Sequence, residues 1–503
     1  CRQQQDDPFE KKDLLRHTIR REKNLKLIIK ARNKMAKPYP KEDHLIGNFA
    51  PLRMESNVGD LIVEGDIPSG INGTYYRNGP DPKFPPRGGK SHWFGGDGMV
   101  HAFHINDGKV SYLNRWMRTV KWTKEDEAGE ALFPSGMDPT DTDPSVQGLE
   151  TDGLANTAIV SHAGKLLALE EAHAPFEFDP HTLESVGSHT FDGKLQGPVT
   201  AHPKVDPKTG ELLFFGYMAD GFFSDTIRFT AVSKEGKITK SELIKAPFPS
   251  MVHDFYATEN YIIIPVFPLT GDFERVINGG PAFAWEPEKG THICILPRDG
   301  SAEDAVWIES DPSFVFHYMN AYEENGSIIS DCMEFGLPPL FPYADGTMPK
   351  QSGVEAKHAR WEIDLNKSKL SKTSLDTITG EFPRFDERFA LQKYSNGYYA
   401  GNIGKHPKGM SLNSIIHYDY STSERHSYTT AEGGAVGEPV FAPKSKNSPD
   451  GEGWLIATEY NAKENRSNLI ILDAQNVSDG PIATAQLPHR IPYGFHGWYE
   501  NRS

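Results

Sequence analysis

The sequence predicts an all-β fold, either a β-propeller or a large β-barrel, for most of its 503 residues. From about residue 58 onward, short runs of alternating apolar and polar residues are separated by turn residues, which is the pattern of half-buried strands. Few segments have helical periodicity, and 46 glycines and 37 prolines supply many turns. Because no strict internal repeat marks individual blades, the strand pattern alone leaves propeller and barrel open.

A basic arm, residues 1–37, precedes the predicted β domain. Eleven lysines and arginines lie between Lys11 and Lys37, where only Asp13 and Glu22 oppose them. Apolar residues at spacings of three and four predict an amphipathic helix over residues 8–37, ended by Pro38-Tyr39-Pro40. Such a helix either packs on the acidic remainder of the chain or docks through residues 11–37 on an anionic membrane surface. Both a cytoplasmic and a peripheral membrane location follow from these alternatives.

Residues 38–503 are predicted to form a single β domain. Its clearest hairpin joins Met99–Ile105 to Lys109–Trp116 through the turn Asn106-Asp107-Gly108. The further strands that the alternation predicts are Phe229–Val232, Tyr261–Val266, His292–Leu296, Ile415–Tyr420, Trp454–Glu459 and Leu469–Leu472. Strands spread so evenly along the chain indicate one closed β architecture.

Composition excludes several classes of protein. The 53 basic and 69 acidic residues give a formal charge of −16, which argues against nucleic acid as a main partner. The three cysteines, Cys1, Cys294 and Cys332, lie far apart without CxxC spacing and are predicted to be free thiols. No run of about 18 apolar residues predicts a membrane-spanning helix. A chain that begins at Cys1 is compatible with a trimmed protein or with a lipid anchor on that cysteine.

Four of the 19 histidines stand out because apolar or aromatic runs surround them. They are His202, His253, His317 and His496. A buried imidazole needs a partner, either a metal ion or a hydrogen bond. Taken singly, each is more commonly a hydrogen-bonded core histidine. The wide separation of the four suits a metal site on the axis of a closed β structure, but spacing alone leaves both interpretations open.

Other sites have weaker support. The sequence contains no HExxH, no GxxxxGK[ST] and no GxSxG motif. Gly95-Gly96-Asp97-Gly98 is better explained as a tight turn than as a phosphate loop, because no helix start follows it. His417-Tyr418-Asp419 has the His-x-Asp spacing of the facial triad of iron oxygenases and is the main rival metal site. It lies in an ordinary alternating strand, which argues against that role.

Several stretches together resemble the carotenoid cleavage oxygenase family, which includes lignostilbene and isoeugenol oxygenases. These stretches are Tyr76–Pro80, Gly95–Ala102, Ala201-His202-Pro203, Val252-His253-Asp254, Phe335 with its neighbours and Gly437–Phe441. They occur in the order of the family, and the resemblance covers residues 46–500.

The resemblance implies a seven-bladed β-propeller with a dome of helices and loops over an axial iron(II) ion. It places the metal ligands at His202, His253, His317 and His496, and it implies that Glu171, Glu381 and Glu438 orient three of them. The implied reaction is the cleavage of a conjugated carbon-carbon double bond by dioxygen to give two carbonyl products. An isomerase that keeps the iron and a propeller that only binds a ligand are the alternatives.

The residues expected to contact the substrate depart from one branch of the family. In the branch that cleaves stilbenes and phenylpropenoids, a lysine and a tyrosine bind the substrate phenol. Glu170 stands at the position of the lysine and Gly136 at that of the tyrosine. We therefore expect an apocarotenoid or a similar apolar alkene, with lignostilbene, resveratrol or isoeugenol types as the alternative.

Overall fold

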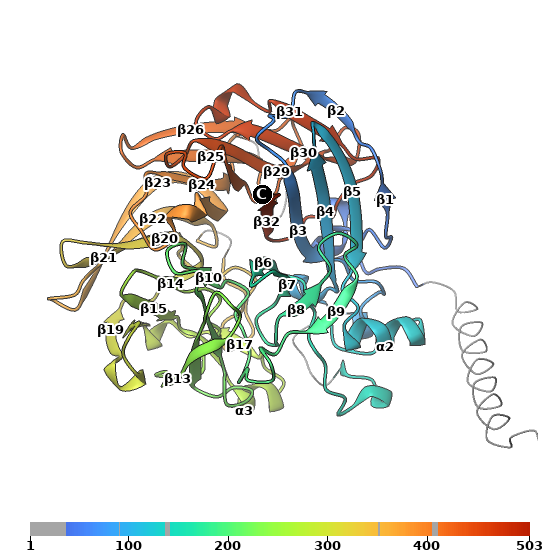
Figure 1. Cartoon of the computed structure of the whole chain (residues 1–503). Helices are drawn as coiled ribbons and strands as arrows, with labels where there is room; N and C mark the ends of the chain where they lie inside the picture. The colour runs from blue at the N-terminus through green and yellow to red at the C-terminus, as the bar shows by residue number, and fades with distance from the viewer. Residues whose placement is uncertain (1–36, 90, 136–140, 351–352, 405–410, 503) are drawn as a thin grey trace, which may run out of the picture.

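The computed structural model describes residues 37–502, apart from residue 90 and residues 136–140, 351–352 and 405–410. Its strands form antiparallel sheets arranged in a ring, with the last strand near the centre (Figure 1). The basic arm that the sequence predicts lies outside the described residues, except for Lys37. Its helix, its membrane contact and a lipid on Cys1 therefore stay predictions.

Seven blades make up the ring. The first blade consists of β1 (Asn57–Val58), β5 (Lys109–Trp116), β4 (Gly98–Asn106), β3 (Gly73–Pro80) and β32 (Gly497–Asn501); the second of β6 (Ala158–His162), β7 (Lys165–Leu169), β8 (Phe176–Phe178) and β9 (Ser185–Ser188). The third consists of β10 (Lys204–Val205), β11 (Leu212–Tyr217), β12 (Thr226–Val232) and β13 (Ile238–Lys245); the fourth of β14 (Tyr256–Ala257), β15 (Tyr261–Val266), β18 (Thr291–Pro297) and β19 (Val306–Ser310); the fifth of β20 (Phe314–Glu324), β21 (Ser327–Phe335), β22 (Ala356–Asp364) and the first part of β23 (Lys369–Phe385). The sixth consists of the rest of β23, β24 (Asn396–Gly401), β25 (Ser414–Asp419) and β26 (Glu424–Thr429); the seventh of β27 (Ala435–Val436), β28 (Val440–Pro443), β29 (Gly453–Asn461), β30 (Arg466–Asp473), β31 (Ala483–Gln486) and β2 (Ile62–Gly65).

Strand β23 belongs to two blades. Up to Thr379 it pairs with β22, and from Gly380 it pairs with β24. The two ends of the described chain close the ring. The C-terminal strand β32 pairs with β3 in the first blade, and the N-terminal strand β2 pairs with β31 in the seventh blade. Such closure fixes the first and last blades to each other and covers sheet edges that would otherwise be exposed.

Two short helices and a two-stranded ribbon lie outside the blades among the described residues. Helix α2 (Val120–Ala128) is capped by Thr119, whose hydroxyl accepts from the amide of Trp122, and it ends at Gly129 with a φ of 72°. Helix α3 (Phe273–Ile277) connects the ribbon strands β16 (Leu269–Gly271) and β17 (Phe283–Trp285). A hydrogen bond from the Met251 amide to the carbonyl of Leu269 joins the ribbon to the segment that carries His253.

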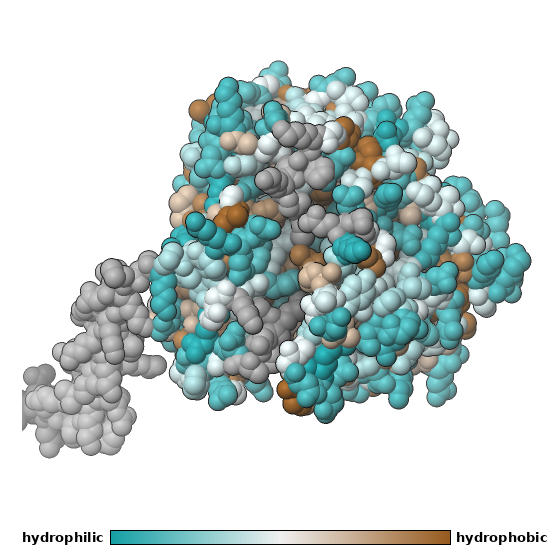
Figure 2. Space-filling model, turned by 180° about the vertical axis from the view of Figure 1, so that it is seen from behind, coloured by the Kyte–Doolittle hydropathy of each residue, from teal (hydrophilic) through white to brown (hydrophobic). Residues whose placement is uncertain are grey.

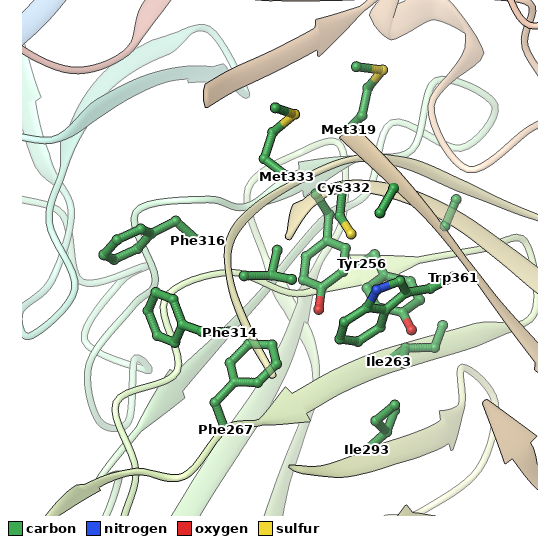
Figure 3. Close-up of a cluster of buried hydrophobic side chains, with 14 of the residues drawn as sticks. Tyr256, Ile263, Phe267, Ile293, Phe314, Phe316, Met319, Cys332, Met333 and Trp361 are labelled. Carbon is green, nitrogen blue, oxygen red and sulfur yellow. The ribbon is translucent and has the colours of Figure 1, made fainter. Parts of the chain in front are cut away.

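The core lies largely between neighbouring blades. Figure 3 shows side chains of the fourth and fifth blades packed together, among them Tyr256, Phe314 and the fully buried Trp361. Phe316 continues this cluster to the ring of His253, at 5.0 Å between ring centroids. Because this packing is tight, the positions of the blades determine the positions of the side chains at the centre of the ring.

The strands predicted from the alternation are confirmed, including β5 and β15 to the residue. The seven-bladed propeller is confirmed as well, and the barrel alternative is wrong. Cys294 and Cys332 are buried free thiols, as predicted. Among the described residues no helix has the length and hydropathy of a membrane span. The face in Figure 2 is largely hydrophilic, with exposed apolar side chains in small separate groups.

Candidate metal centre

The four histidines singled out in the sequence meet on the axis of the ring. His202 lies just before β10, His253 before β14 and His496 before β32, whereas His317 lies within β20. One ring nitrogen from each of the four lies within 4.8 Å of the corresponding nitrogen of every other one. Four different blades thus deliver one imidazole each to a single point.

Strand β20 is irregular where it carries His317. Its pairing with β21 shifts register between Val315 and Tyr318 and again between Tyr318 and Asn320. Bulges of this kind turn a side chain away from the direction that regular alternation would give it. The irregularity explains how His317 reaches the centre from inside a long strand, while the other three histidines lie just before their strands.

The remaining three blades each contribute one carboxylate. The Nδ1 atom of His253 donates to Glu171, that of His317 to Glu381 at 2.5 Å, and that of His496 to Glu438 at 2.9 Å. Glu171 follows β7, Glu381 lies in the second part of β23, and Glu438 lies between β27 and β28. Every blade therefore supplies one residue to the centre, four of them histidines and three glutamates.

These carboxylates determine where the ring protons lie. A neutral imidazole that donates through Nδ1 has a lone pair on Nε2. The Nε2 atoms of His253 and His317 are 3.0 Å apart, although both rings donate through Nδ1. Two lone pairs that face each other at this distance repel unless a cation lies between the rings. The donor set thus fits a metal ion better than it fits a hydrogen-bonded histidine core.

Burial and mutual repulsion keep two of the imidazoles neutral. Burial lowers the pKa of His202 and of His317 well below the ordinary value, and the neighbouring histidines lower it further. The pKa of His253 is raised instead, because the carboxylate of Glu171 outweighs the effect of burial. Carboxylates thus surround the converging nitrogen atoms, and a bound cation would neutralise their negative charge.

The carboxylates of Glu381 and Glu438 differ in their surroundings. Burial raises the pKa of Glu381 to about 8, and its Oε1 has no hydrogen-bond partner in the described part of the chain. Burial also opposes ionisation of Glu438, but Arg384 and His496 outweigh it and lower the pKa to about 2. Glu438 therefore carries a firmly held negative charge, whereas a cation bound at the centre would favour the ionised form of Glu381 that accepts from His317.

Sequence reasoning missed four residues that support this arrangement. Tyr217 donates to Glu171 at 2.8 Å, and Arg384 donates to Glu438 at 3.4 Å. Asp254 is buried and forms an ion pair with the partly exposed Lys204 beside the histidines. Among the four, Asp254 had a signal in the sequence, because a charge within the apolar stretch 251–256 requires a partner.

The rival sites have structural roles. His417 donates through Nε2 to Oδ1 of Asn396 at 2.9 Å and stacks on Tyr398, whereas Asp419 caps the turn at Ser421. They are not brought together as ligands. Gly95 ends a 3-10 turn (Trp93–Gly95), and Gly96 and Asp97 connect that turn to β4, which begins at Gly98.

Glu170 pairs with His173, and the pKa of that histidine is raised because Glu170 outweighs burial. Glu171, and not Glu170, therefore reaches the metal centre. Gly136 lies outside the described residues.

Comparisons with known proteins agree with this geometry. The family described as retinal pigment epithelial membrane protein matches residues 49–501. Isoeugenol monooxygenase from Pseudomonas nitroreducens is 38% identical over 480 aligned positions, which cover 93% of this chain and 100% of that protein. Lignostilbene-alpha,beta-dioxygenase isozyme III from Sphingomonas paucimobilis is 34% identical, with coverage of 92% and 98%.

Solved structures match over the same range. The lignostilbene dioxygenase of Pseudomonas brassicacearum superimposes with a TM-score of 0.89 at 34% identity, covering 93% of this chain and 100% of that one. Cobalt-substituted apocarotenoid oxygenase of Synechocystis superimposes with a TM-score of 0.79 at 29% identity, covering 90% and 97%. The second of these structures holds a metal ion, as its cobalt substitution states.

Proposed function

Because the chain belongs to the carotenoid oxygenase family, we propose that it is an iron(II)-dependent dioxygenase that cleaves a conjugated carbon-carbon double bond. The observation that carries this proposal is the convergence of four imidazole nitrogens, three of them from rings whose outer N–H is held by a carboxylate. Relatives at more than 30% identity are named isoeugenol monooxygenase and lignostilbene dioxygenase, and an apocarotenoid oxygenase of similar structure is cobalt-substituted.

The choice of iron follows from the donor set. Imidazole nitrogen suits iron, zinc and copper, and four neutral ligands leave the ion its full positive charge. The chemistry that iron supplies when bound is the activation of dioxygen, whose two oxygen atoms add across the double bond to give two carbonyl products. Since the alkene supplies the electrons, no carboxylate ligand and no organic cosubstrate is required.

The protein contributes orientation and an apolar surrounding. Glu171, Glu381 and Glu438 fix the tautomers of three ligands. The ring of Phe382 lies 5.8 Å from that of His317 and 5.4 Å from that of His496, and Phe316 packs against His253. These aromatic rings limit water at the centre, which protects a reactive site from side reactions. Since no proton transfer to the substrate is needed, the site requires no general acid or base.

Two observations define the substrate class. Among the relatives above, isoeugenol monooxygenase and lignostilbene dioxygenase act on aryl alkenes, as their names state. Yet Glu170, at the position of the phenol-binding lysine, already binds His173. We therefore propose a conjugated alkene that needs no free phenol, either an apocarotenoid or an aryl alkene, with O2 as cosubstrate.

Turnover should depend little on a free 4-hydroxyl group. A site built to bind a substrate hydroxyl rejects an analogue without it by about 10⁴-fold or more, whereas an apolar site discriminates between such analogues by about 10–200-fold. The values of kcat/KM for isoeugenol and for its 4-O-methyl ether should therefore agree within about 200-fold. A ratio of a thousand or more in favour of the free phenol would show that another residue binds the hydroxyl.

Purified protein should contain about one iron per chain, because the described residues form one four-histidine centre. Incubation with apocarotenals, resveratrol, isoeugenol and its methyl ether under labelled dioxygen should give aldehydes that carry the label, detected by mass spectrometry. Label in both carbonyl products supports cleavage. A rearranged alkene without label would indicate an isomerase, and no conversion of any substrate by iron-loaded protein would indicate a binding protein.

A further inference from the structure

Asp254 is a buried carboxylate that no part of the proposed reaction uses. Its side chain is 2% exposed and accepts three hydrogen bonds. Oδ1 accepts from Lys204 Nζ at 2.8 Å and from the amide of Phe255 at 2.8 Å. Oδ2 accepts from the amide of Tyr318 at 2.9 Å. Removing such a charge from water is costly unless its partners are well placed, so this arrangement has a structural consequence.

Each partner from another blade lies next to a different histidine. Tyr318 follows His317 in β20, and Lys204 lies two residues after His202 at the start of β10. Asp254 itself follows His253. One side chain therefore connects the segments that carry three of the four histidines, and these segments belong to the third, fourth and fifth blades.

A second link joins two of the same segments. The hydroxyl of Thr200 donates to the carbonyl of His253 at 3.2 Å and accepts from the amide of His202 at 3.1 Å. Thr200 acts between the third and fourth blades alone. Asp254 adds the fifth blade, where the register shifts of β20 leave the position of His317 least constrained by regular pairing.

We propose that Asp254 is a positioning residue that sets the spacing of His202, His253 and His317 and thereby the affinity and geometry of the metal site. This inference rests on the proposed metal function. Two carboxylate oxygens are required, because one faces the Lys204 ammonium and the other faces the Tyr318 amide. An amide in the same place has one acceptor oxygen, and its NH2 group must face one of these two donors.

The test measures Co²⁺ binding to the metal-free full-length chain, together with the visible ligand-field spectrum of the loaded protein. D254N is expected to weaken Co²⁺ binding by about 10–100-fold, the usual effect of losing a group that orients ligands, and to change the spectrum. K204M removes one of the three hydrogen bonds and retains the length of the side chain that packs near Phe255. It should give a smaller loss and a smaller spectral change.

Asp386 provides the matched control. The side chain of Asp386 is 1% exposed and pairs with Arg388, which is 23% exposed. In the other pair, Asp254 is 2% exposed and Lys204 is 23% exposed. D386N should lower stability yet leave Co²⁺ affinity within about twofold and the spectrum unchanged, because the hydrogen bonds described for the Asp386 carboxylate go to Arg388 and join no segment that carries a ligand histidine.

The outcomes separate the two claims. If the wild-type chain binds no Co²⁺, the proposed metal function fails and the role of Asp254 falls with it. If the wild-type chain binds Co²⁺ and D254N binds it equally well with the same spectrum, only the role of Asp254 is wrong. Should D254N fail to fold, K204M decides in the same way, because an unchanged affinity and spectrum in K204M would overturn the proposal.

Discussion

Replacement of His253 by alanine is expected to abolish metal binding and turnover together. The Nε2 atom of His253 lies 3.0 Å from that of His202 and 3.0 Å from that of His317, so its loss opens the middle of the cluster. Glu171 also loses the ring that it orients. Since groups that merely orient ligands are worth about 10–100-fold in affinity, a direct ligand should be worth at least about a hundredfold.

Metal content after purification and the rate of aldehyde formation measure this effect. The matched control is H417A, because His417 is 4% exposed and His253 is 6% exposed. His417 is held by Asn396 and lies in the strand that carries the rival His-x-Asp pattern. H417A should lose stability and keep its iron. Iron that is lost from H417A and retained by H253A would move the metal site to the rival pair.

The local pattern of the sequence was sufficient to predict the strands. Alternation over a few residues determines which side chains face the core, and hairpins such as Met99–Ile105 with Lys109–Trp116 depend on neighbours in the chain. The number of blades had no such local signal. It depends on β23 serving two blades and on the closure by β2 and β32, which join residues more than four hundred positions apart. Resemblance to a family supplied what periodicity could not.

The metal centre was predictable to a similar extent. Each histidine lay in an apolar run, but partners such as His202 and His253 are 51 residues apart, and spacing does not reveal that they meet. The same limit explains why the sequence alone predicts no role for Asp254. Its partners Lys204 and the Tyr318 amide are 50 and 64 residues away. A buried charge indicates that a partner exists, but the partner is identified only once the packing of the blades is known.

The replacement of Glu438 by glutamine is expected to weaken both the metal site and the fold. Oε1 of Glu438 accepts from His496, and Oε2 accepts from the amide of Gly497 at 2.7 Å and from Arg384. An amide has a single acceptor oxygen, so its NH2 group must face one of these donors. Metal affinity should fall by about 10–100-fold. The free energy of unfolding of the metal-free protein should fall by about 2 kcal/mol, because the mostly buried Arg384 loses one of its two carboxylate partners and keeps Glu387.

The two effects of E438Q have different causes, and a second substitution separates them. In the E438Q background, R384M removes a mostly buried cation that retains only Glu387 as a partner, and it should restore part of the stability, measured by denaturant unfolding of the metal-free protein. It cannot restore the acceptor for His496, so the metal affinity should stay low. Recovery of affinity by R384M would mean that charge balance, and not the orientation of His496, controls binding.

Glu125 offers a control with nearly the same surroundings. Its side chain is 3% exposed, as is that of Glu438. One oxygen accepts from the amides of Leu132 and Phe133, and the other accepts from Lys121 at 2.9 Å. E125Q should therefore lose stability on the scale of E438Q and keep its full affinity for metal. A loss of metal by E125Q would show that unfolding alone accounts for the effect, whereas its retention assigns the loss in E438Q to the hydrogen bond that fixes His496.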